Sequence, residues 1–266
     1  MKLLFWNARG NDVMGIALRC MREHDVDIAV FAEWQGLGLA GVAEASQGEY
    51  CIVENGGCDK VRFLVRKSVG FELRCEQSRY SISLASCYGA SYLIAGLHLQ
   101  TRLYGDSGAR INLASRIMAD VAEEANATGC GNVVVIGDFN ANPYDLELIQ
   151  PDAFNAVLFK DVINAQDTCS FAGVEYRRLY NPAIDFLSED GKTYGSYYWT
   201  SSEKASTVWH CLDQVLVSAS LVDRVADLRY LREIDGASLM NRVKPNGNIS
   251  DHLPLLVKIA DCEVAR

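Results

Sequence analysis

Residues 133–143 read Val-Val-Val-Ile-Gly-Asp-Phe-Asn-Ala-Asn-Pro, and they carry more structural information than any other stretch of the chain. The first four residues are apolar and β-branched, which is typical of a β-strand. Asp138 and Asn140 follow this run directly. A strand that ends in an acid and an amide is one way in which a rigid sheet presents catalytic groups, although Gly-Asp-Phe-Asn alone also fits ordinary turn chemistry.

The same arrangement recurs along the chain. Short apolar runs are directly followed or preceded by acidic, amide or imidazole residues, namely Asn7, Glu33, His98, Asp138, Asn140, Asp213, Asp251 and His252. Taken singly, each residue is explained as well by a turn or a helix cap. The strand ends of a sandwich lie on a common rim, however, so polar groups held by several strands can converge on one cleft. The repeated pattern therefore indicates a catalytic constellation.

Eight apolar runs predict strands, and two patterns with i, i+3, i+4 spacing predict helices. The strands are residues 3–6, 28–31, 61–65, 82–86, 92–99, 133–136, 212–217 and 255–259. One helix covers Ile16–Met21 with Asn11 as a candidate N-cap, and the other covers residues 108–128. No repeat, low-complexity tract or Pro- or Gly/Ser-rich linker divides the chain, so we predict a single domain over residues 1–266.

The stretch from residue 171 to residue 209 differs from the rest of the chain. It is rich in tyrosine and polar residues and lacks clean periodicity. Long irregular segments in compact domains are usually functional, so we predict that this stretch is a loop region that takes part in substrate choice.

The composition is that of a folded protein, since 49% of the 266 residues are apolar and 22% are charged. The longest apolar runs are far shorter than about 20 residues, the length that crosses a bilayer. The apolar segment at the start is too short for a secretory signal, so we predict a cytoplasmic protein. The nine cysteines are dispersed without a Cys-x-x-Cys pair, which favours reduced thiols; a Cys51–Cys58 bridge would require an oxidising compartment.

The formal net charge of −9 restricts the kind of partner. It argues against a protein that holds nucleic acid by a large basic surface, because affinity from counterion release needs many lysines and arginines on one face. It leaves open a phosphate-directed enzyme, because a bound metal ion supplies the positive charge that the side chains lack.

Six short segments complete a pattern that runs through nearly the whole chain. They are Phe5–Asn7, Ala32–Gln35, Leu97–Leu99, Gly137–Pro143, Leu212–Val215 and Ser250–Pro254. Together they resemble the endonuclease/exonuclease/phosphatase superfamily of pancreatic-type DNases, abasic-site endonucleases, inositol polyphosphate 5-phosphatases and sphingomyelinases. The resemblance implies an α/β fold, a four-layered sandwich of two packed mixed β-sheets flanked by helices. It also implies metal-dependent hydrolysis of a phosphoester.

The resemblance further implies a metal site. Glu33 is a hard oxygen ligand suited to Mg²⁺, which usually takes one or two carboxylates plus substrate phosphate. Asp251 would add a second carboxylate, and Asn7 a neutral contact to the metal or the phosphate. We therefore expect Mg²⁺ as the cofactor, with Mn²⁺ as the alternative.

Four further residues receive catalytic roles by the same resemblance. Asp138 would orient or deprotonate the attacking water, and Asn140 would donate a hydrogen bond to the scissile phosphate or to that water. His252 would donate to a phosphoryl oxygen as negative charge accumulates. Asp213 would hold the imidazole of His252 in the correct tautomer and favour its protonated form.

The remaining candidates bind phosphate. His98 matches the second histidine of the DNase-like branch, which contacts phosphate or assists the leaving group, and Arg79 and Arg9 are expected to bind substrate. The branch pairs this histidine with a carboxylate from an adjacent strand, but residues 61–66 contain no acid. The sequence leaves the partner of His98 open.

The leading hypothesis is a Mg²⁺-dependent phosphodiesterase that acts on nucleic acid, most simply as a monomer. The aromatic stretch would stack bases, and Arg9, Arg102, Arg177 and Arg178 would hold phosphates. One alternative is a phosphatase or phosphodiesterase of a small phosphorylated metabolite or a lipid headgroup. Another is a catalytically silent protein that works by binding a partner. Metal-dependent turnover separates these classes.

Overall fold

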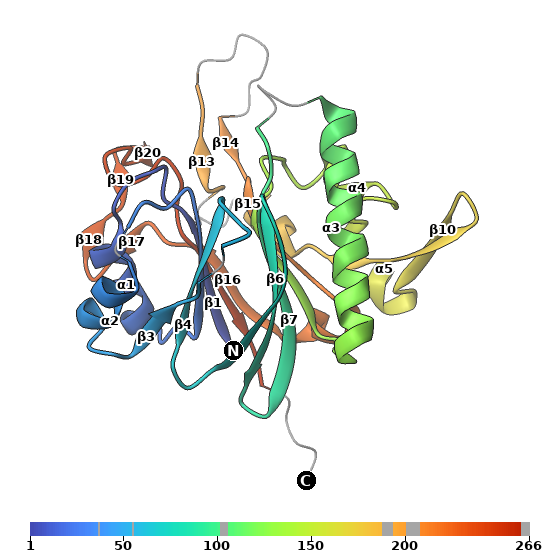
Figure 1. Ribbon diagram of the computed structural model, residues 1–266. Coiled ribbons are helices and arrows are strands. Elements are labelled where there is room, and N and C mark those ends of the chain that lie inside the picture. Colours follow the sequence, from blue (N-terminus) through green and yellow to red (C-terminus); the bar gives the residue numbers. More distant parts are fainter. Residues whose placement is uncertain (37, 55, 102–105, 188–193, 201–207, 262–266) are drawn as a thin grey trace.

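Two mixed β-sheets pack against each other at the centre of the protein (Figure 1). The computed structural model describes residues 1–36, 38–54, 56–101, 106–187, 194–200 and 208–261. The six-stranded sheet has the order β16 (Val225–Tyr230), β21 (Leu255–Ile259), β1 (Lys2–Asn7), β2 (Ile28–Ala32), β4 (Val61–Arg66) and β3 (Tyr50–Ile52). The seven-stranded sheet has the order β5 (Gly70–Gln77), β6 (Tyr80–Cys87), β7 (Ala90–His98), β8 (Val133–Asp138), β15 (Asp213–Val217), β12 (Leu179–Tyr180) and β9 (Ala156–Val157).

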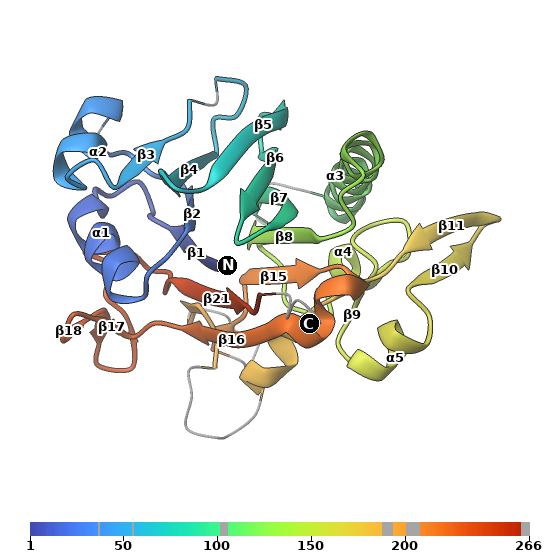
Figure 2. The ribbon, with the colours of Figure 1, turned by 90° about the horizontal axis from the view of Figure 1, so that it is seen from below.

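Helices cover the outer face of each sheet. Helices α1 (Met14–Glu23) and α2 (Leu39–Ala45) lie outside the six-stranded sheet, and α3 (Ser107–Thr128) with α4 (Leu146–Ile149) lies outside the seven-stranded sheet (Figure 2). The shorter elements are α5 (Lys160–Ala165), the 3₁₀ turns Pro182–Leu187 and Ala219–Arg224, and the hairpins β10–β11 (Thr168–Phe171, Val174–Arg177), β13–β14 (Tyr197–Tyr198, Trp209–His210), β17–β18 (Glu233–Ile234, Ala237–Ser238) and β19–β20 (Met240–Asn241, Lys244–Pro245). The predicted four-layered α/β sandwich is confirmed.

The apolar run of β8 is buried on both faces because it lies between two cores. Val134 and Ile136 point into the core that includes the space between the sheets, whereas Val133 and Val135 belong to a second core under α3. Successive residues of a strand point to opposite faces, so a strand covered on both sides needs an uninterrupted apolar run.

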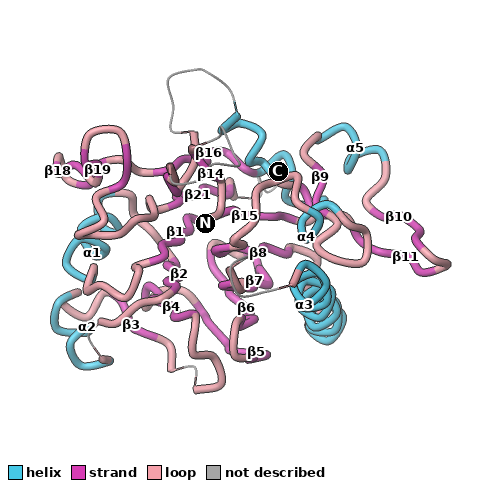
Figure 3. Tube along the Cα trace, turned by 90° about the horizontal axis from the view of Figure 1, so that it is seen from above, coloured by secondary structure: helices cyan, strands magenta, loops and turns pink. Residues whose placement is uncertain are grey.

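Strand direction and register bring the polar strand ends to one edge. In the seven-stranded sheet, parallel β7 and β8 place His98 opposite Asp138, and antiparallel β15 places its first residue, Asp213, opposite Asp138 as well. In the six-stranded sheet, parallel β1 and β2 place Asn7 opposite Ala32, and β21 runs antiparallel to β1. The ends of β1, β2, β7 and β8 therefore share an edge with the starts of β15 and β21, which is the edge viewed in Figure 3.

The helix predictions hold with one correction. The helix predicted over residues 108–128 is α3, and it ends at Gly129, whose φ of 66° suits a residue without a Cβ. Asn11 is not the cap of α1, because its side chain donates to Ile249 O at 2.9 Å instead. The N-cap residue is Val13, which makes no side-chain capping hydrogen bond, and Asp12 Oδ1 accepts the backbone N–H of Met14 at 3.0 Å.

The aromatic stretch 171–209 is not one irregular loop. Its first part completes the β10–β11 hairpin, which projects from the body of the molecule beyond α5 (Figures 1 and 2). Its later part contributes β13 and β14, and Tyr197 of β13 forms a backbone bridge with His252. Residues 188–193 and 201–207 lie outside the described residues. The prediction of one long loop is therefore wrong for the hairpin.

Two further observations concern composition. The eight cysteines within the described ranges are free thiols, as predicted. None of the helices described is long and apolar enough to cross a membrane.

Gly137 makes the close pairing of β7 and β8 sterically possible. A Cβ at this position would overlap with the carbonyl oxygen of Leu97 and would lie 2.8 Å from Cγ of the Leu97 side chain. We expect Gly137→Ala to lower the free energy of unfolding by about 3 kcal/mol or more, because backbone cannot move aside as a side chain can. Urea unfolding followed by circular dichroism measures this loss.

Gly15 of α1 provides the matched control, since nothing lies within 4 Å of a Cβ built there. Gly15→Ala should raise the free energy of unfolding by about 0.5–1 kcal/mol through helix propensity. Equal unfolding midpoints for the two variants would contradict the steric role of Gly137.

Candidate active site

Eight of the residues predicted from the sequence lie along the shared edge of the two sheets. They belong to six strands or the residues beside them: Asn7 (β1), Glu33 (after β2), His98 (β7), Asp138 and Asn140 (β8 and after), Asp213 (β15), and Asp251 and His252 (before β21). Because each strand is fixed within a packed sheet, these side chains are held by the rigid part of the fold.

Asp138 lies at the centre of this group and is 1% exposed. Its Oδ2 accepts a hydrogen bond from Asn7 Nδ2 at 2.9 Å, and its Oδ1 accepts one from the backbone N–H of Asn140 at 2.8 Å. Burial, and then the charge of Asp213, raises the pKa of Asp138. The result is a carboxylate that is fixed in direction and more basic than usual.

His252 and Asp213 form a buried hydrogen-bonded pair. His252 Nδ1 and Asp213 Oδ2 are 2.8 Å apart, and Asp213 is completely buried. Burial alone would lower the pKa of His252, but the charge and hydrogen bond of Asp213 outweigh it and raise the pKa of His252 to about 10. The imidazole is therefore protonated at neutral pH and donates hydrogen bonds.

Three residues whose roles were not predicted hold His252 in place. Trp6 Nε1 donates to the carbonyl oxygen of His252 at 3.0 Å. Ser250 Oγ accepts the backbone N–H of His252 at 3.0 Å and donates to Asn7 O at 2.6 Å. The ring of Tyr197 packs 4.9 Å from the imidazole, centroid to centroid. The sequence offered one signal, since a tryptophan in a buried strand needs an acceptor for its N–H.

Two carboxylates lie close to His98, whose ring nitrogens are buried without a hydrogen bond among the described residues. Its Nε2 lies 3.3 Å from Glu33 Oε1 and 3.7 Å from Asp138 Oδ2, so the acids come from the ends of β2 and β8 rather than from β4. Burial lowers the pKa of His98 to about 3, and Arg79 and then His252 contribute in the same direction. The two histidines of the site therefore differ in charge, with His98 neutral and His252 protonated.

Two of the predicted arginines border the site. Arg9 Nε lies 3.3 Å from Asp251 Oδ2, and its Nη1 donates to Gly247 O at 3.1 Å. Arg79 precedes β6. Its carbonyl oxygen accepts the backbone N–H of His98 at 2.9 Å, and its Nη1 donates to the carbonyl oxygen of His98 at 3.5 Å. Arg102 lies outside the described residues.

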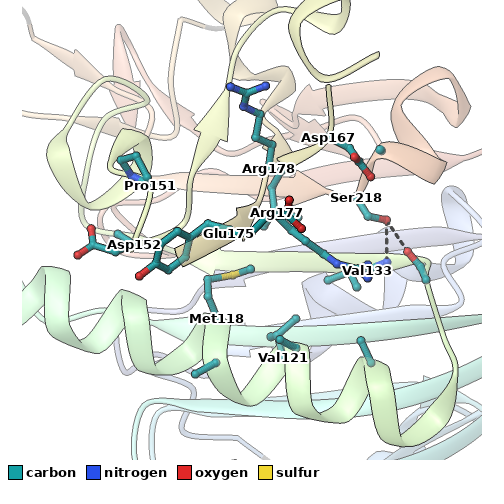
Figure 4. A pocket seen from close by; sticks show the side chains of 18 of the residues that line it. Met118, Val121, Val133, Pro151, Asp152, Asp167, Glu175, Arg177, Arg178 and Ser218 are labelled. Atoms are coloured by element: carbon teal, nitrogen blue, oxygen red, sulfur yellow. Dashed lines mark hydrogen bonds between the residues drawn. The ribbon is translucent and has the colours of Figure 1, made fainter. Parts of the chain in front are cut away.

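Arg177 and Arg178 lie elsewhere. They line a cavity of about 590 Å³ between α3 and the β10–β11 hairpin (Figure 4). Val133 also lines this cavity and begins β8, whereas Asp138 ends the strand. At about 3.3 Å per residue, the two ends of β8 are about 17 Å apart. These two arginines therefore do not belong to the group of side chains at the candidate site.

Two groups of side chains offer ligand atoms for a metal ion. Asp138, Asp213 and His252 have ligand atoms within 4.8 Å of one another, but His252 Nδ1 is already bonded to Asp213. Glu33 and Asn7 stand at the ends of neighbouring strands, and the Glu33 carboxylate is 40% exposed. Oxygen ligands of this kind fit a hard cation such as Mg²⁺ or Mn²⁺.

The local charge balance also fits a cation. Glu33, Asp138, Asp213 and Asp251 all lie along this edge, and Asp213 Oδ1 is buried without a hydrogen-bond partner among the described residues. A bound cation would offset the repulsion that raises the pKa of Asp138.

Comparison with protein families decides the relationship. The model of the Endonuclease/Exonuclease/phosphatase family matches residues 4–252. The chain belongs to this family. Members of this family hydrolyse phosphoric esters and are generally dependent on a divalent metal. No curated protein matched the sequence.

Solved structures of this family share the fold. Truncated TDP2 of Caenorhabditis elegans is 17% identical, with a TM-score of 0.58 over 98% of this chain and 97% of that chain. TDP2 of D. rerio complexed with single strand DNA product is 16% identical, with a TM-score of 0.56 over 98% and 99%. A mannosyl-6-phosphatase of Bacteroides thetaiotaomicron is 15% identical, with a TM-score of 0.61 over 98% and 100%.

Proposed function

We propose that this member of the Endonuclease/Exonuclease/phosphatase family is a nuclease that hydrolyses phosphodiester bonds of DNA or RNA by in-line attack of water. The observation that carries the proposal is an aromatic platform, defined as Tyr197 and Trp199, that continues from the ring of His252. The two aromatic rings are nearly parallel, at 16° with centroids 6.4 Å apart. Trp199 is 46% exposed, so a base can reach it. Stacking platforms beside a phosphate site are how single strands are held.

Asp138 and Asn140 act on the attacking water in this proposal. Asp138 orients the water and takes its proton, for which its raised pKa suits it. Asn140 donates to the scissile phosphate or to the water, while its Nδ2 also donates to Leu99 O at 3.0 Å. That bond leaves one N–H of the amide for the substrate.

The two histidines act on the phosphate. His252, kept protonated by Asp213, donates to a phosphoryl oxygen as negative charge accumulates there. His98, as a neutral imidazole, contacts the phosphate or assists the leaving group. Arg9 and Arg79, which border the site, bind neighbouring phosphates of the strand.

Glu33, Asn7 and Asp251 would hold the divalent ion, Mg²⁺ or alternatively Mn²⁺. Bound there, the ion supplies positive charge to the phosphoryl oxygens, which a protein of net charge −9 otherwise lacks. Asp251 is paired with Arg9 in this structure, so it would share its carboxylate between the two cations.

A second candidate function is hydrolysis of a small phosphorylated metabolite or a lipid headgroup. The net charge of −9 favours it, because a polynucleotide is repelled more strongly than a small ester. The structural similarity to the mannosyl-6-phosphatase also supports this second function.

Hydrolysis assays distinguish these functions. Single-stranded DNA, double-stranded DNA, RNA, a hexose 6-phosphate and bis-p-nitrophenyl phosphate are each incubated with Mg²⁺ or Mn²⁺, with EDTA as the control. We expect metal-dependent cleavage of a polynucleotide. Cleavage of the small esters alone would replace the nuclease proposal with the second function, and no turnover on any substrate would favour a binding protein.

Removing the outer ring of the aromatic platform tests base stacking directly. We expect Trp199→Ala to raise the KM for single-stranded DNA by about 5- to 150-fold, because a stacked base contributes about 1–3 kcal/mol. The kcat for the same DNA should stay within about twofold of wild type, since the loss of uniform binding raises KM and leaves kcat unchanged.

Phe171→Ala is the matched control, because Phe171 is similarly exposed, at 43%, but ends β10 in the hairpin that projects from the body. Its KM for DNA should be that of wild type. An unchanged KM in Trp199→Ala would contradict the stacking role of the platform.

A further inference from the structure

Among the described residues, Arg110 is the largest charged side chain that is fully buried. It lies in the first turn of α3, is 2% exposed and has no direct place among the candidate catalytic residues. A buried guanidinium is costly unless every donor finds a partner. Its partners therefore show what the fold gains by burying it.

The guanidinium of Arg110 joins three segments. Its Nε donates to Glu147 Oε1 of α4 at 2.5 Å. Its Nη1 donates to the carbonyl oxygen of Gln100, two residues beyond His98. Its Nη2 donates to the carbonyl oxygens of Phe139 at 3.2 Å and Asn140 at 2.9 Å.

Two of these segments carry candidate catalytic side chains. Residues 98–100 follow β7 and include His98, and residues 138–140 end β8 and include Asp138 and Asn140. Two hydrogen bonds join these segments directly, from Leu99 N to Asp138 O at 2.9 Å and from Asn140 Nδ2 to Leu99 O at 3.0 Å. The carbonyl oxygens of Gln100, Phe139 and Asn140 lie beyond the strand ends and need other donors. Arg110 supplies donors to both.

The backbone conformation of Asn140 shows that this loop depends on contacts from its surroundings. Its φ of 47° lies in the left-handed region, which costs a residue with a Cβ and persists only when the surroundings fix it. Its carbonyl is fixed by Arg110, its N–H by Asp138 Oδ1, and the next carbonyl, that of Ala141, by Gln214 Nε2 at 2.6 Å.

We propose that Arg110 is a positioning residue that fixes the loop 138–140 relative to the segment after His98 and so sets the geometry of the hydrolytic site. It acts through backbone carbonyls and touches no substrate. The catalytic part of this inference rests on the proposed phosphoester hydrolysis. A misplacement of about 1 Å in such a site costs about 10²-fold in rate. Loss of the hydrogen bonds of Arg110 should therefore lower kcat by a measurable amount.

The rival explanation is that Arg110 only stabilises the fold through Glu147. The double variant Arg110→Met/Glu147→Leu separates the two, because it removes both charges of this ion pair together. Arg110→Lys is the second variant, since an ammonium keeps the ion pair with Glu147 but has no planar fork to reach carbonyls on both segments.

Arg224→Met is the matched control. Arg224 also donates to a backbone carbonyl, that of Ala260 at 2.8 and 2.9 Å, and to Tyr92 Oη at 2.7 Å, but these residues lie outside the candidate site. Its loss should lower the unfolding midpoint without changing kcat.

Two readouts decide the question. We expect both Arg110 variants to melt cooperatively. Their kcat on bis-p-nitrophenyl phosphate should fall by about 10- to 100-fold, with KM within about threefold of wild type. Hydrogen-exchange protection of the Asn140 amide should fall by about tenfold or more. Arg224→Met should change neither kcat nor this amide. Wild-type kcat and protection in the double variant would overturn the proposal, and so would failure of both Arg110 variants to fold.

The exchange readout does not depend on turnover. If wild type hydrolyses none of the phosphoesters, the proposed function fails, and the Asn140 amide still shows whether Arg110 fixes the loop. If wild type is active and the variants keep both kcat and protection, the positioning role alone fails.

Discussion

The His252→Ala variant is expected to lose about 10³- to 10⁴-fold in kcat on any phosphoester that the wild type hydrolyses. His252 is buried, hydrogen-bonded to Asp213 at 2.8 Å, and held by Trp6 and Ser250 through its backbone. Only its imidazole is lost in the variant, so the positioning contacts remain while the donor to the transition state disappears. Initial rates at saturating metal and substrate measure the loss.

Asp213→Asn provides the companion measurement. The amide keeps the size of the side chain but removes the charge that holds the pKa of His252 high. We expect about 10²- to 10³-fold lower kcat, and a weaker combined effect in the double variant than the product of the single ones, because the two residues act as a unit. Activity of His252→Ala within tenfold of wild type would refute its role as donor.

Glu33→Gln is expected to lower kcat/KM by about 10²-fold or more and to raise the metal concentration needed for half-maximal activity by about 10-fold or more. The substitution keeps the shape of a side chain that is 40% exposed, but it removes the negative charge offered to a divalent ion. Stability should hardly change, because the side chain is partly exposed and the amide keeps the size of the group beside His98. A titration with Mn²⁺ or Mg²⁺ after treatment with EDTA measures both effects.

Glu175→Gln is the control for this prediction. Glu175 is an exposed acid of the β10–β11 hairpin, beyond the other end of β8. Its loss changes the net charge by the same amount, so any general effect of charge on metal or substrate affinity appears in both variants. If Glu33→Gln shows the metal dependence of Glu175→Gln, Glu33 is not a metal ligand.

Most positions of the strands that the sequence predicts are buried. All eight predicted apolar runs are strands, and β1, β2, β8 and β15 are fully buried along almost their whole length. Such strands need apolar residues at every position, so they are visible without any partner. Strands β5 and β16 were missed because exposed and half-buried residues alternate along them, and each pairs on one side only.

The candidate site was predicted better than the contacts that hold it. Polar residues beside apolar runs are a local signal, and register then brought Asp138, His98 and Asp213 together. The roles of Trp6 and Arg110 depend on partners far along the chain or on backbone carbonyls, which no spacing rule reveals. For the same reason the family pattern placed the acid beside His98 on the strand of residues 61–66, whereas the structure places Glu33 there.

The central position of β1 has a consequence for how this protein is made. It pairs with β2, which is close in sequence, and with β21, and Trp6 is bonded to His252 across 246 residues. Contacts between such distant residues form late and slow folding. During synthesis the seven-stranded sheet can assemble while β1 still lacks one neighbour, so we expect the candidate site to be completed only when Asp251, His252 and β21 have left the ribosome and docked.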